Sequence, residues 1–268
     1  MIDLHCHMLP AIDDGAPEWD TALEMARIAI GDGIRVTVCT PHIYPGLYEN
    51  TAQGIRASVT EFEERLQQAG LSLKLGVGAD THLVPDLLAG LRSGRIPTLN
   101  GSRYLLLEPP HHVAPPRLLE TCFALLATGY LPIITHPERL SWIEDNYPLF
   151  QELAYRGVWM QVTAGSLTGR FGPQARYWAE RMLDEGLVHL LATDAHGVRH
   201  RPPLLAEGRR VAERWLGPQE AMRLVEERPQ GVIQDIDSNQ LPVPPGLLPP
   251  DRKKRRVSAA SFWRQLFG

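Results

Sequence analysis

The chain has 268 residues, a mass of 29.9 kDa, 44% hydrophobic and 22% charged residues, which is the composition of an ordinary globular protein. Its net charge of −4 argues against a protein that coats nucleic acid, and no apolar run approaches the roughly 20 residues of a membrane-spanning helix. Three cysteines are too few, and odd in number, for a disulfide framework, so a cytoplasmic protein is expected.

The chain opens with a short apolar run that reaches two histidines, His5 and His7, and an acidic turn with Asp14 follows. In an extended segment, residues i and i+2 point to the same side, so the two imidazoles can converge on one point as the strand ends. A single His-x-His is weak evidence, because many histidines are ordinary polar residues.

The same design recurs along the chain: an apolar run of β type ends in a side chain that can bind a metal. The runs at 36–42, 73–80, 104–108, 131–136 and 188–196 end in His42, Asp80, Glu108, His136, and the pair Asp194 and His196. One more strand is predicted at 158–162. This repetition, rather than any single residue, indicates a shared site.

Apolar residues at helical spacing predict helices between these runs. The predicted ranges are 17–30, 51–69, 85–91, 116–128, 146–155, 174–184, 204–215 and 218–226. Glycine after the second and fourth helices, and Gly217-Pro218 between the last two, suit helix boundaries. Strands that alternate with helices indicate a parallel sheet with right-handed crossovers.

A parallel sheet is either open or closed into a barrel, and in both cases function lies at the carboxyl ends of the strands. Here the candidate ligands come from strands spread over the whole chain, and a closed barrel brings both ends of the chain to one site. We therefore expect an α/β fold, a distorted TIM-like (β/α)7 barrel, over residues 1–238.

The composition changes in the last part of the chain, 239–268. Prolines between 241 and 250 predict a stiff, extended linker. Five basic residues at 252–256 and an aromatic, amphipathic end at 258–267 follow. This tail could contact an anionic membrane surface or a partner, or it could fold back on the body, and both alternatives stay open.

Nine imidazole and carboxylate side chains are candidate metal ligands: His5, His7, Asp14, His42, Asp80, Glu108, His136, Asp194 and His196. They are too many for one ion and enough for two or three with a bridging carboxylate, and the mixture suits Mn, Fe or Zn. The other histidines are expected to be structural or to lie beside a substrate; they are His82, His111, His112, His189 and His200.

Hydrolysis of a phosphate ester is a reaction that such a cluster supports, because cations neutralise phosphoryl oxygens and supply hydroxide near neutral pH. Arg139 and Arg201 follow two of the ligands closely, and we expect them to be catalytic groups that bind phosphate oxygens. Either arginine could instead form an ordinary surface ion pair. No Cys-x5-Arg loop is present, which disfavours a cysteine phosphatase.

Five stretches resemble the polymerase-and-histidinol-phosphatase (PHP) superfamily. They are IDLHCHMLPAIDDG, TPHIYPGLYEN, IPTLNGSRYLLLE, ITHPERL and LATDAHGVRHRPP, within residues 1–235. More closely, they resemble the bacterial manganese-dependent protein-tyrosine phosphatases encoded with capsule and exopolysaccharide genes. The resemblance implies hydrolysis of protein phosphotyrosine, with a membrane-associated bacterial tyrosine kinase as substrate. It also implies two or three divalent ions, Mn preferred and Fe, Zn or Co as alternatives.

The same resemblance implies how the ligands divide. One metal would be held by His5, His7 and Asp194, a second by Glu108 and His136, and a third by Asp14, His42 and His196, with Asp80 between the first two. The family usually has glutamate at the bridging position. Aspartate is one methylene shorter, which puts the spacing of these two metals in question.

Two alternatives remain. Within enzymes, the protein could be a histidinol phosphatase or another hydrolase of small phosphoesters on the same scaffold. In a different class, an inactive barrel could act through its tail, although the complete ligand set counts against that. An oligomer, and a peripheral position at the inner membrane face, are left open.

Overall fold

The structure is a computed structural model that describes residues 1–249 of the chain. The basic and aromatic tail expected at 252–267 lies outside the described residues. Within the described part, no helix is both long enough and apolar enough to cross a membrane.

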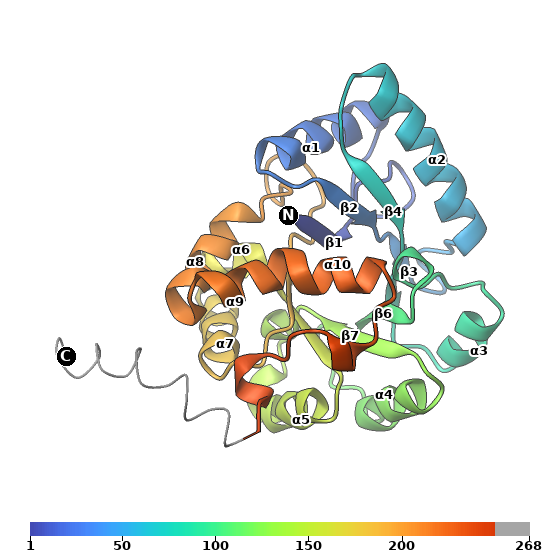
Figure 1. Ribbon diagram of the computed structural model, residues 1–268. Helices are drawn as coiled ribbons and strands as arrows, with labels where there is room; N and C mark the ends of the chain where they lie inside the picture. Colours follow the sequence, from blue (N-terminus) through green and yellow to red (C-terminus); the bar gives the residue numbers. More distant parts are fainter. Residues whose placement is uncertain (250–268) are drawn as a thin grey trace.

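Parallel strands form the centre of the molecule (Figure 1). Their bounds are β1 Ile2–Cys6, β2 Val36–Cys39, β3 His42–Ile43, β4 Lys74–Val77, β5 Asp80–His82, β6 Tyr104–Glu108, β7 Leu131–Thr135, β8 Trp159–Thr163 and β9 Leu190–Ala192. They pair in the order β1-β2-β4 in one sheet and β3-β5-β6-β7-β8-β9 in the other.

Hydrogen bonds join the two sheets into a ring. The β2–β4 pairing continues into the β3–β5 pairing, because Gly78 N donates to Cys39 O at 3.0 Å and Asp80 N donates to Pro41 O at 3.1 Å. On the other side, β9 meets β1, where Asp194 N donates to His5 O at 2.8 Å. β2 and β3 are two halves of one interrupted strand, and so are β4 and β5. When each pair is counted as one position, seven strand positions close a barrel, as the sequence predicted.

The interior of the barrel is apolar and forms its own cluster of buried side chains. These are Ile2, Leu4, Val38, Leu99, Tyr104, Leu106, Leu131, Ile133, Trp159, Leu190, Val232 and Leu241. Strands buried on both faces appear in sequence as nearly continuous apolar runs, which is why the sequence located them well.

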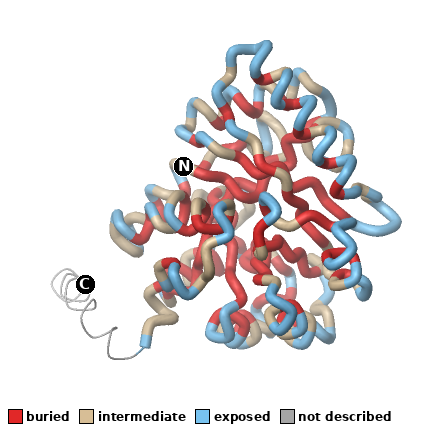
Figure 2. Tube along the Cα trace, turned by 45° about the vertical axis from the view of Figure 1, so that its right-hand side comes forward, coloured by how far each residue is buried: buried red, intermediate tan, exposed pale blue. Residues whose placement is uncertain are grey.

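Helices surround the strands and leave the exposed surface to their outer faces (Figure 2). Their bounds are α1 Trp19–Gly31, α2 Ala52–Gln68, α3 Leu87–Arg92, α4 Leu118–Ala127, α5 Ile143–Tyr155, α6 Ala164–Leu167, α7 Gly172–Asp184, α8 Ala206–Leu216, α9 Pro218–Met222 and α10 Arg228–Ile233. Short turns of 3-10 helix occur at η1 Leu99–Gly101, η2 Pro137–Arg139, η4 Ser238–Gln240 and η5 Pro245–Leu247. Helix α2 buries Ile55, Val59, Phe62 and Leu66, the face that its periodicity predicted.

The last helical segment departs from the prediction. It was expected to end at Glu226, but a π-helical turn, η3 at Arg223–Glu227, continues into α10 and on to Ile233. Pro229 does not stop it, because the proline lies directly after the π-helical turn, where the regular i→i−4 pattern of backbone hydrogen bonds is already interrupted. Helix α10 lies in front of β1 (Figure 1) and its Val232 packs into the barrel interior, so this segment closes the barrel at the amino ends of the strands.

The described part of the proline-rich segment packs on the body. Arg228 Nε donates to Pro242 O at 2.7 Å, and Gly246 N donates to Gly186 O at 3.0 Å. A Cβ on Gly246 would lie 1.9 Å from Glu185 O, so only glycine allows this close approach. The segment from 241 to 247 is therefore not an extended spacer, while the boundary between 238 and 239 stays a prediction.

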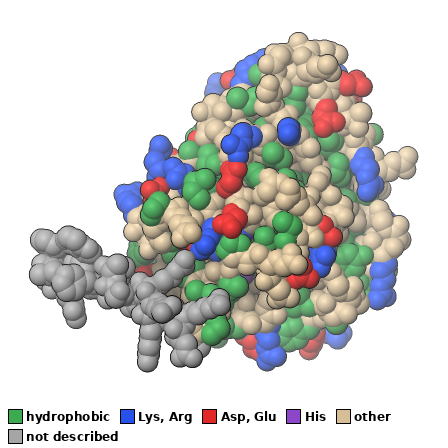
Figure 3. Space-filling model, viewed as in Figure 1, with side chains coloured by type: hydrophobic (Ala, Val, Ile, Leu, Met, Phe, Trp, Pro, Cys, Tyr) green, Lys and Arg blue, Asp and Glu red, His purple; other side chains and the backbone are tan. Residues whose placement is uncertain are grey.

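The face over α10 carries acidic and basic side chains interspersed (Figure 3). Glu226, for example, pairs with Arg35 and lies 3.2 Å from the amino terminus. On the part of this face that Figure 3 shows for the described residues, charges of both signs are mixed.

Candidate metal centre

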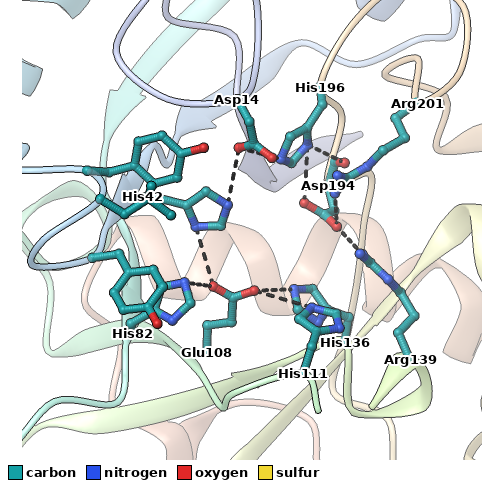
Figure 4. Close-up of a pocket in the computed structure, with 13 residues that line it drawn as sticks. Asp14, His42, His82, Glu108, His111, His136, Arg139, Asp194, His196 and Arg201 are labelled. Atoms are coloured by element: carbon teal, nitrogen blue, oxygen red, sulfur yellow. Dashed lines mark hydrogen bonds and ion pairs between the residues drawn. The ribbon is translucent and has the colours of Figure 1, made fainter. Parts of the chain in front are cut away.

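The predicted ligands converge at the carboxyl ends of the strands, around a cavity of about 250 Å³ (Figure 4). Six of the nine line the cavity, namely Asp14, His42, Glu108, His136, Asp194 and His196. The other three, His5, His7 and Asp80, are fully buried beside it. All nine side chains are therefore brought together, although they come from seven separate segments of the chain.

The two histidines of β1 face the same point, as the i, i+2 spacing predicted. Their Nε2 atoms lie 3.1 Å apart, and His5 Nε2 lies 3.3 Å from both Asp80 Oδ2 and Asp194 Oδ1. His7 Nε2 lies 3.5 Å from the same Asp194 oxygen. Two imidazoles and two carboxylates thus surround one position.

Hydrogen bonds behind these histidines orient their rings. His5 Nδ1 lies 2.8 Å from Gln161 Oε1, and His7 Nδ1 lies 2.7 Å from Asp13 Oδ2. Such partners hold the ring and direct its other nitrogen toward a metal. The sequence pattern singled out neither Gln161 nor Asp13. Gln161 could have been found as the polar residue of an otherwise apolar strand.

A second group forms around His42, which lies between two sets of carboxylates. Its Nε2 is 3.4 Å from Asp14 Oδ1, and His196 Nε2 is also 3.4 Å from that oxygen. On its other side, His42 Nδ1 lies 3.4 Å from Glu108 Oε2 and 3.5 Å from Asp80 Oδ2. His42 therefore connects the parts of the cluster.

Glu108 gathers three more imidazoles. His136 Nε2 and His111 Nε2 lie 3.5 and 3.4 Å from its Oε1, and His82 Nε2 lies 2.5 Å from its Oε2. His82 and His111 were not counted among the ligands from the sequence. A signal for His82 was present, because it stands two residues after Asp80 in an extended segment, the same spacing as His5 and His7.

The remaining histidines lie outside this cluster. His189 is buried at the other end of the barrel, where its Nδ1 accepts a hydrogen bond from Met160 N and its ring stacks on Trp159. This is the structural role expected of it. His112 and His200 are exposed.

The carboxylates make the cluster a place that favours positive charge. Burial lowers the pKa of His5, but the charges of Asp80 and Asp194 outweigh that effect and raise the pKa to about 9. At His42, burial is likewise outweighed, by Glu108 and Asp80, and the pKa rises to about 9. Burial raises the pKa of Glu108, but hydrogen bonds with His111, His42 and His82 hold it far below its usual range. Burial instead lowers the pKa of His136 and of His196, so the carboxylates stabilise positive charge at His5 and His42 in particular, where a metal cation would take the place of the proton.

Unpaired polar atoms test whether a metal fits this site. Asp80 is fully buried, and neither of its oxygens accepts a hydrogen bond. His136 Nδ1 and His196 Nε2 are also buried without a hydrogen-bond partner. A buried carboxylate that accepts no hydrogen bond is costly even with imidazoles 3.3 and 3.5 Å away, and metal coordination would remove that cost. Residues 1–249 contain five overlapping groups of His, Asp and Glu whose ligand atoms lie within 4.8 Å of one another, so the donor set fits divalent cations.

Arg139 and Arg201 lie together at the edge of the cavity (Figure 4). Both donate to Asp194 Oδ2, and their guanidinium groups lie 4.3 and 5.8 Å from the ring of Phe171. The two oxygens of Asp194 thus serve different groups, histidines at one and arginines at the other. The sequence left open that either arginine forms an ordinary surface ion pair. Both arginines do form ion pairs, but their partner is Asp194, a buried candidate ligand, and not a surface residue.

The backbone turns sharply where two of these side chains leave their strands. His136 follows β7 with φ of 33°, and Asp194 follows β9 with φ of 49°. Non-glycine residues rarely adopt this left-handed region, and such positions gather at functional sites, where the surroundings hold them. The turns direct both side chains across the end of the barrel.

Known proteins are similar to this chain in sequence and in fold. Residues 1–234 match the family described as capsular polysaccharide synthesis, CpsB/CapC. Tyrosine-protein phosphatase YwqE of Bacillus subtilis is 34% identical over 84% of this chain and 89% of its own length. Tyrosine-protein phosphatase CpsB of Streptococcus pneumoniae is 28% identical over 88% of this chain and 99% of its own.

A solved structure agrees with these sequence matches. A chain from the crystal structures of YwqE from Bacillus subtilis and CpsB from Streptococcus pneumoniae, described as unique metal-dependent tyrosine phosphatases, superposes with a TM-score of 0.85. The two chains are 33% identical, over 88% of this chain and 96% of the other. The family match alone spans most of the barrel, and the chain belongs to the CpsB/CapC family of capsular polysaccharide synthesis.

Proposed function

We propose that this protein is a metal-dependent phosphatase that hydrolyses phosphotyrosine in proteins. One observation carries the proposal: nine imidazole and carboxylate side chains and two arginines converge on one cavity. The named relatives from Bacillus subtilis and Streptococcus pneumoniae, which are tyrosine-protein phosphatases, support phosphotyrosine as the substrate.

The cluster would hold two or three divalent ions, with Mn preferred and Fe, Zn or Co as alternatives. The ligands would divide as the resemblance implies, with Asp80 between two ions, and His82 and His111 lie close enough to Glu108 to contribute. Bound divalent cations neutralise phosphoryl oxygens and make hydroxide available near neutral pH.

The arginines would bind the phosphate oxygens that face the cavity. A guanidinium group matches the geometry of phosphate through two parallel hydrogen bonds. The guanidinium of Arg139 lies over the ring of Phe171 at 4.3 Å and that of Arg201 lies 5.8 Å from it, and Asp194 pairs with both groups. Such preorganised positive charge lowers the cost of binding a phosphate dianion.

Purified protein should hydrolyse a phosphotyrosine peptide with a higher kcat/KM than histidinol phosphate. Because the ligand set is complete, protein prepared without chelator should carry more than one equivalent of transition metal, and EDTA should remove the activity. Elemental analysis and steady-state kinetics measure both. A preference for histidinol phosphate would favour the small-substrate hydrolase, and a metal-free, EDTA-insensitive preparation would favour the inactive scaffold.

Asp80→Ala should abolish turnover and lower the metal content, because it removes a carboxylate whose two buried oxygens have no hydrogen-bond partner. Asp80→Glu restores the residue usual in the resembling family and should retain or improve activity. Asp80→Asn, with the same shape and no charge, is the matched control and should behave like the alanine variant. Full activity in Asp80→Ala would remove Asp80 from the site.

The proposed protein substrate is a membrane-associated bacterial tyrosine kinase that acts in polysaccharide synthesis. The family description supports the polysaccharide part. We propose that residues 239–268, although 241–247 pack on the body, act as a functional segment of their own, because the five basic residues at 252–256 attract the protein to an anionic membrane. A cytoplasmic protein at the inner face of the membrane would fit this role.

A further inference from the structure

The chain that follows β3 folds into a tight turn beside the cavity. Tyr44 N donates to Tyr48 O at 3.0 Å, and Tyr48 N donates back to Tyr44 O at 2.8 Å. Gly46 supplies the left-handed conformation at the tip, with φ of 87°. Asn50 Nδ2 ties the base of the turn to His42 O and Ile12 O. Backbone hydrogen bonds across the turn and side-chain hydrogen bonds at its base therefore restrict its conformation.

Three apolar or aromatic side chains of this turn line the cavity: Tyr44, Leu47 and Tyr48. We call them the aromatic wall. The ring of Tyr44 stacks on His82, with centroids 3.9 Å apart, and the ring of Tyr48 stacks on His42 at 5.6 Å. Leu47 is 62% exposed and can neither coordinate a metal nor donate a hydrogen bond. An exposed leucine at the edge of a strongly charged cavity contributes nothing to the binding of phosphate itself.

The wall lies across the cavity from the arginines. Figure 4 shows His42 and His82 on one side and Arg139 and Arg201 on the other. Because Tyr44 and Tyr48 stack on those two histidines, the cavity has a cationic side and an apolar side. A ligand that suits both has a phosphate at one end and a flat apolar group next to it.

We propose that Tyr44, Leu47 and Tyr48 form the binding surface for the aromatic ring of the substrate and select aryl phosphates over alkyl phosphates. This inference rests on the proposed phosphatase function. Aromatic rings pack favourably in offset or edge contacts and against aliphatic groups. The phosphorylated side chain of serine or threonine has no ring, so it would leave the wall in contact with water. The turn is already ordered, so little conformational entropy is lost when it binds the ring.

Two non-hydrolysable probes separate the ring from the phosphate. Phenylphosphonate carries both groups, and methylphosphonate carries only the anionic one. They are used as inhibitors of the full-length, metal-loaded protein acting on a phosphotyrosine peptide. Leu47→Ala and Tyr44→Leu are each expected to raise KM for the peptide and Ki for phenylphosphonate by about threefold to tenfold. Ki for methylphosphonate and kcat are expected to change by less than twofold.

Leu47→Phe restores apolar surface and should bring KM back to the wild-type value or below. Tyr155→Ala is the matched control, since Tyr155 is equally exposed, at 62%, but ends α5 at the other end of the barrel. This variant should leave KM and kcat for the peptide, and Ki for both phosphonates, unchanged.

Two results overturn the inference while leaving the proposed function intact. The first is peptide turnover with equal wild-type affinity for the two phosphonates. The second is a loss of kcat, or a matching loss of affinity for both phosphonates, in Leu47→Ala and Tyr44→Leu, which would mean that the wall acts by holding His42 and His82. Absence of peptide turnover in the wild-type protein would instead refute the proposed function, and this inference with it.

Discussion

Asp194→Asn and His136→Ala are each expected to lower turnover of a phosphotyrosine peptide by more than about 100-fold, because even partners behind metal ligands are worth 10- to 100-fold. Asp194 is buried, with one oxygen 3.3 Å from His5 and the other paired with Arg139 and Arg201. A single substitution therefore disturbs both the candidate metal ligands and the candidate phosphate-binding groups. His136 lies 3.5 Å from Glu108 and has a buried nitrogen without a partner.

Both variants should stay folded, because the two residues lie after the ends of their strands and outside the packed interior of the barrel. Asparagine keeps the shape of aspartate and tolerates the left-handed backbone at position 194. Circular dichroism and elemental analysis accompany the kinetics, and His112→Ala, at an exposed histidine, is the control. Unfolding of either variant in the presence of metal would mean that the site is structural.

Arg228→Ala is expected to lower the free energy of unfolding by about 3–5 kcal/mol, the usual cost of breaking a buried ion pair by removing one partner. The side chain of Arg228 is fully buried and pairs with Glu220, which is 2% exposed. Its Nε donates to Pro242 O at 2.7 Å and its Nη1 to His189 O at 3.2 Å. One guanidinium thus connects α10, α9, the proline-rich segment and the chain entering β9.

Urea denaturation measures this loss, and the matched comparison is the double variant Arg228→Met with Glu220→Gln. It removes both charges, so it should recover much of the stability. Arg27→Ala, at an exposed pair with Glu24, should change the free energy of unfolding by less than about 1 kcal/mol. A loss below about 1 kcal/mol in Arg228→Ala would show that Arg223, whose Nη1 already lies 3.0 Å from Glu220 Oε2, balances the charge of Glu220 without Arg228.

Much of the fold could be predicted because the strands are buried on both faces. β6 was predicted at 104–108 and is found at Tyr104–Glu108. β7 was predicted at 131–136 and is found at Leu131–Thr135, one residue shorter. The convergence of the ligands was predictable for a related reason. Parallel strands of one barrel place their carboxyl ends on one face, so side chains at those ends come close however far apart they stand in the sequence.

Segments held by long-range contacts were harder to predict. The helix ending at Ile233 and the packed segment at 241–247 depend on Arg228, which looks in sequence like an ordinary exposed charge. His111 looked like a loop histidine because no local pattern reveals that Glu108 lies beside it. For His82 the local signal was its spacing of two residues after Asp80, but its contact with Glu108 depends on the tertiary structure. A buried arginine and a shared carboxylate become visible only when their partners are in place.

By itself, the sequence determined the order of strands and helices, the end of each strand at which a ligand stands, and the family, because these depend on the spacing of nearby residues. The tertiary structure alone decided the distances between the ligands, that His82 and His111 join Glu108, that both arginines share Asp194, and that an aromatic wall faces them across the cavity. Those contacts join residues as far apart as His5 and Asp194. Their distances depend on how the strands twist, tilt and close into a ring, and that geometry is a property of the whole barrel rather than of any one segment.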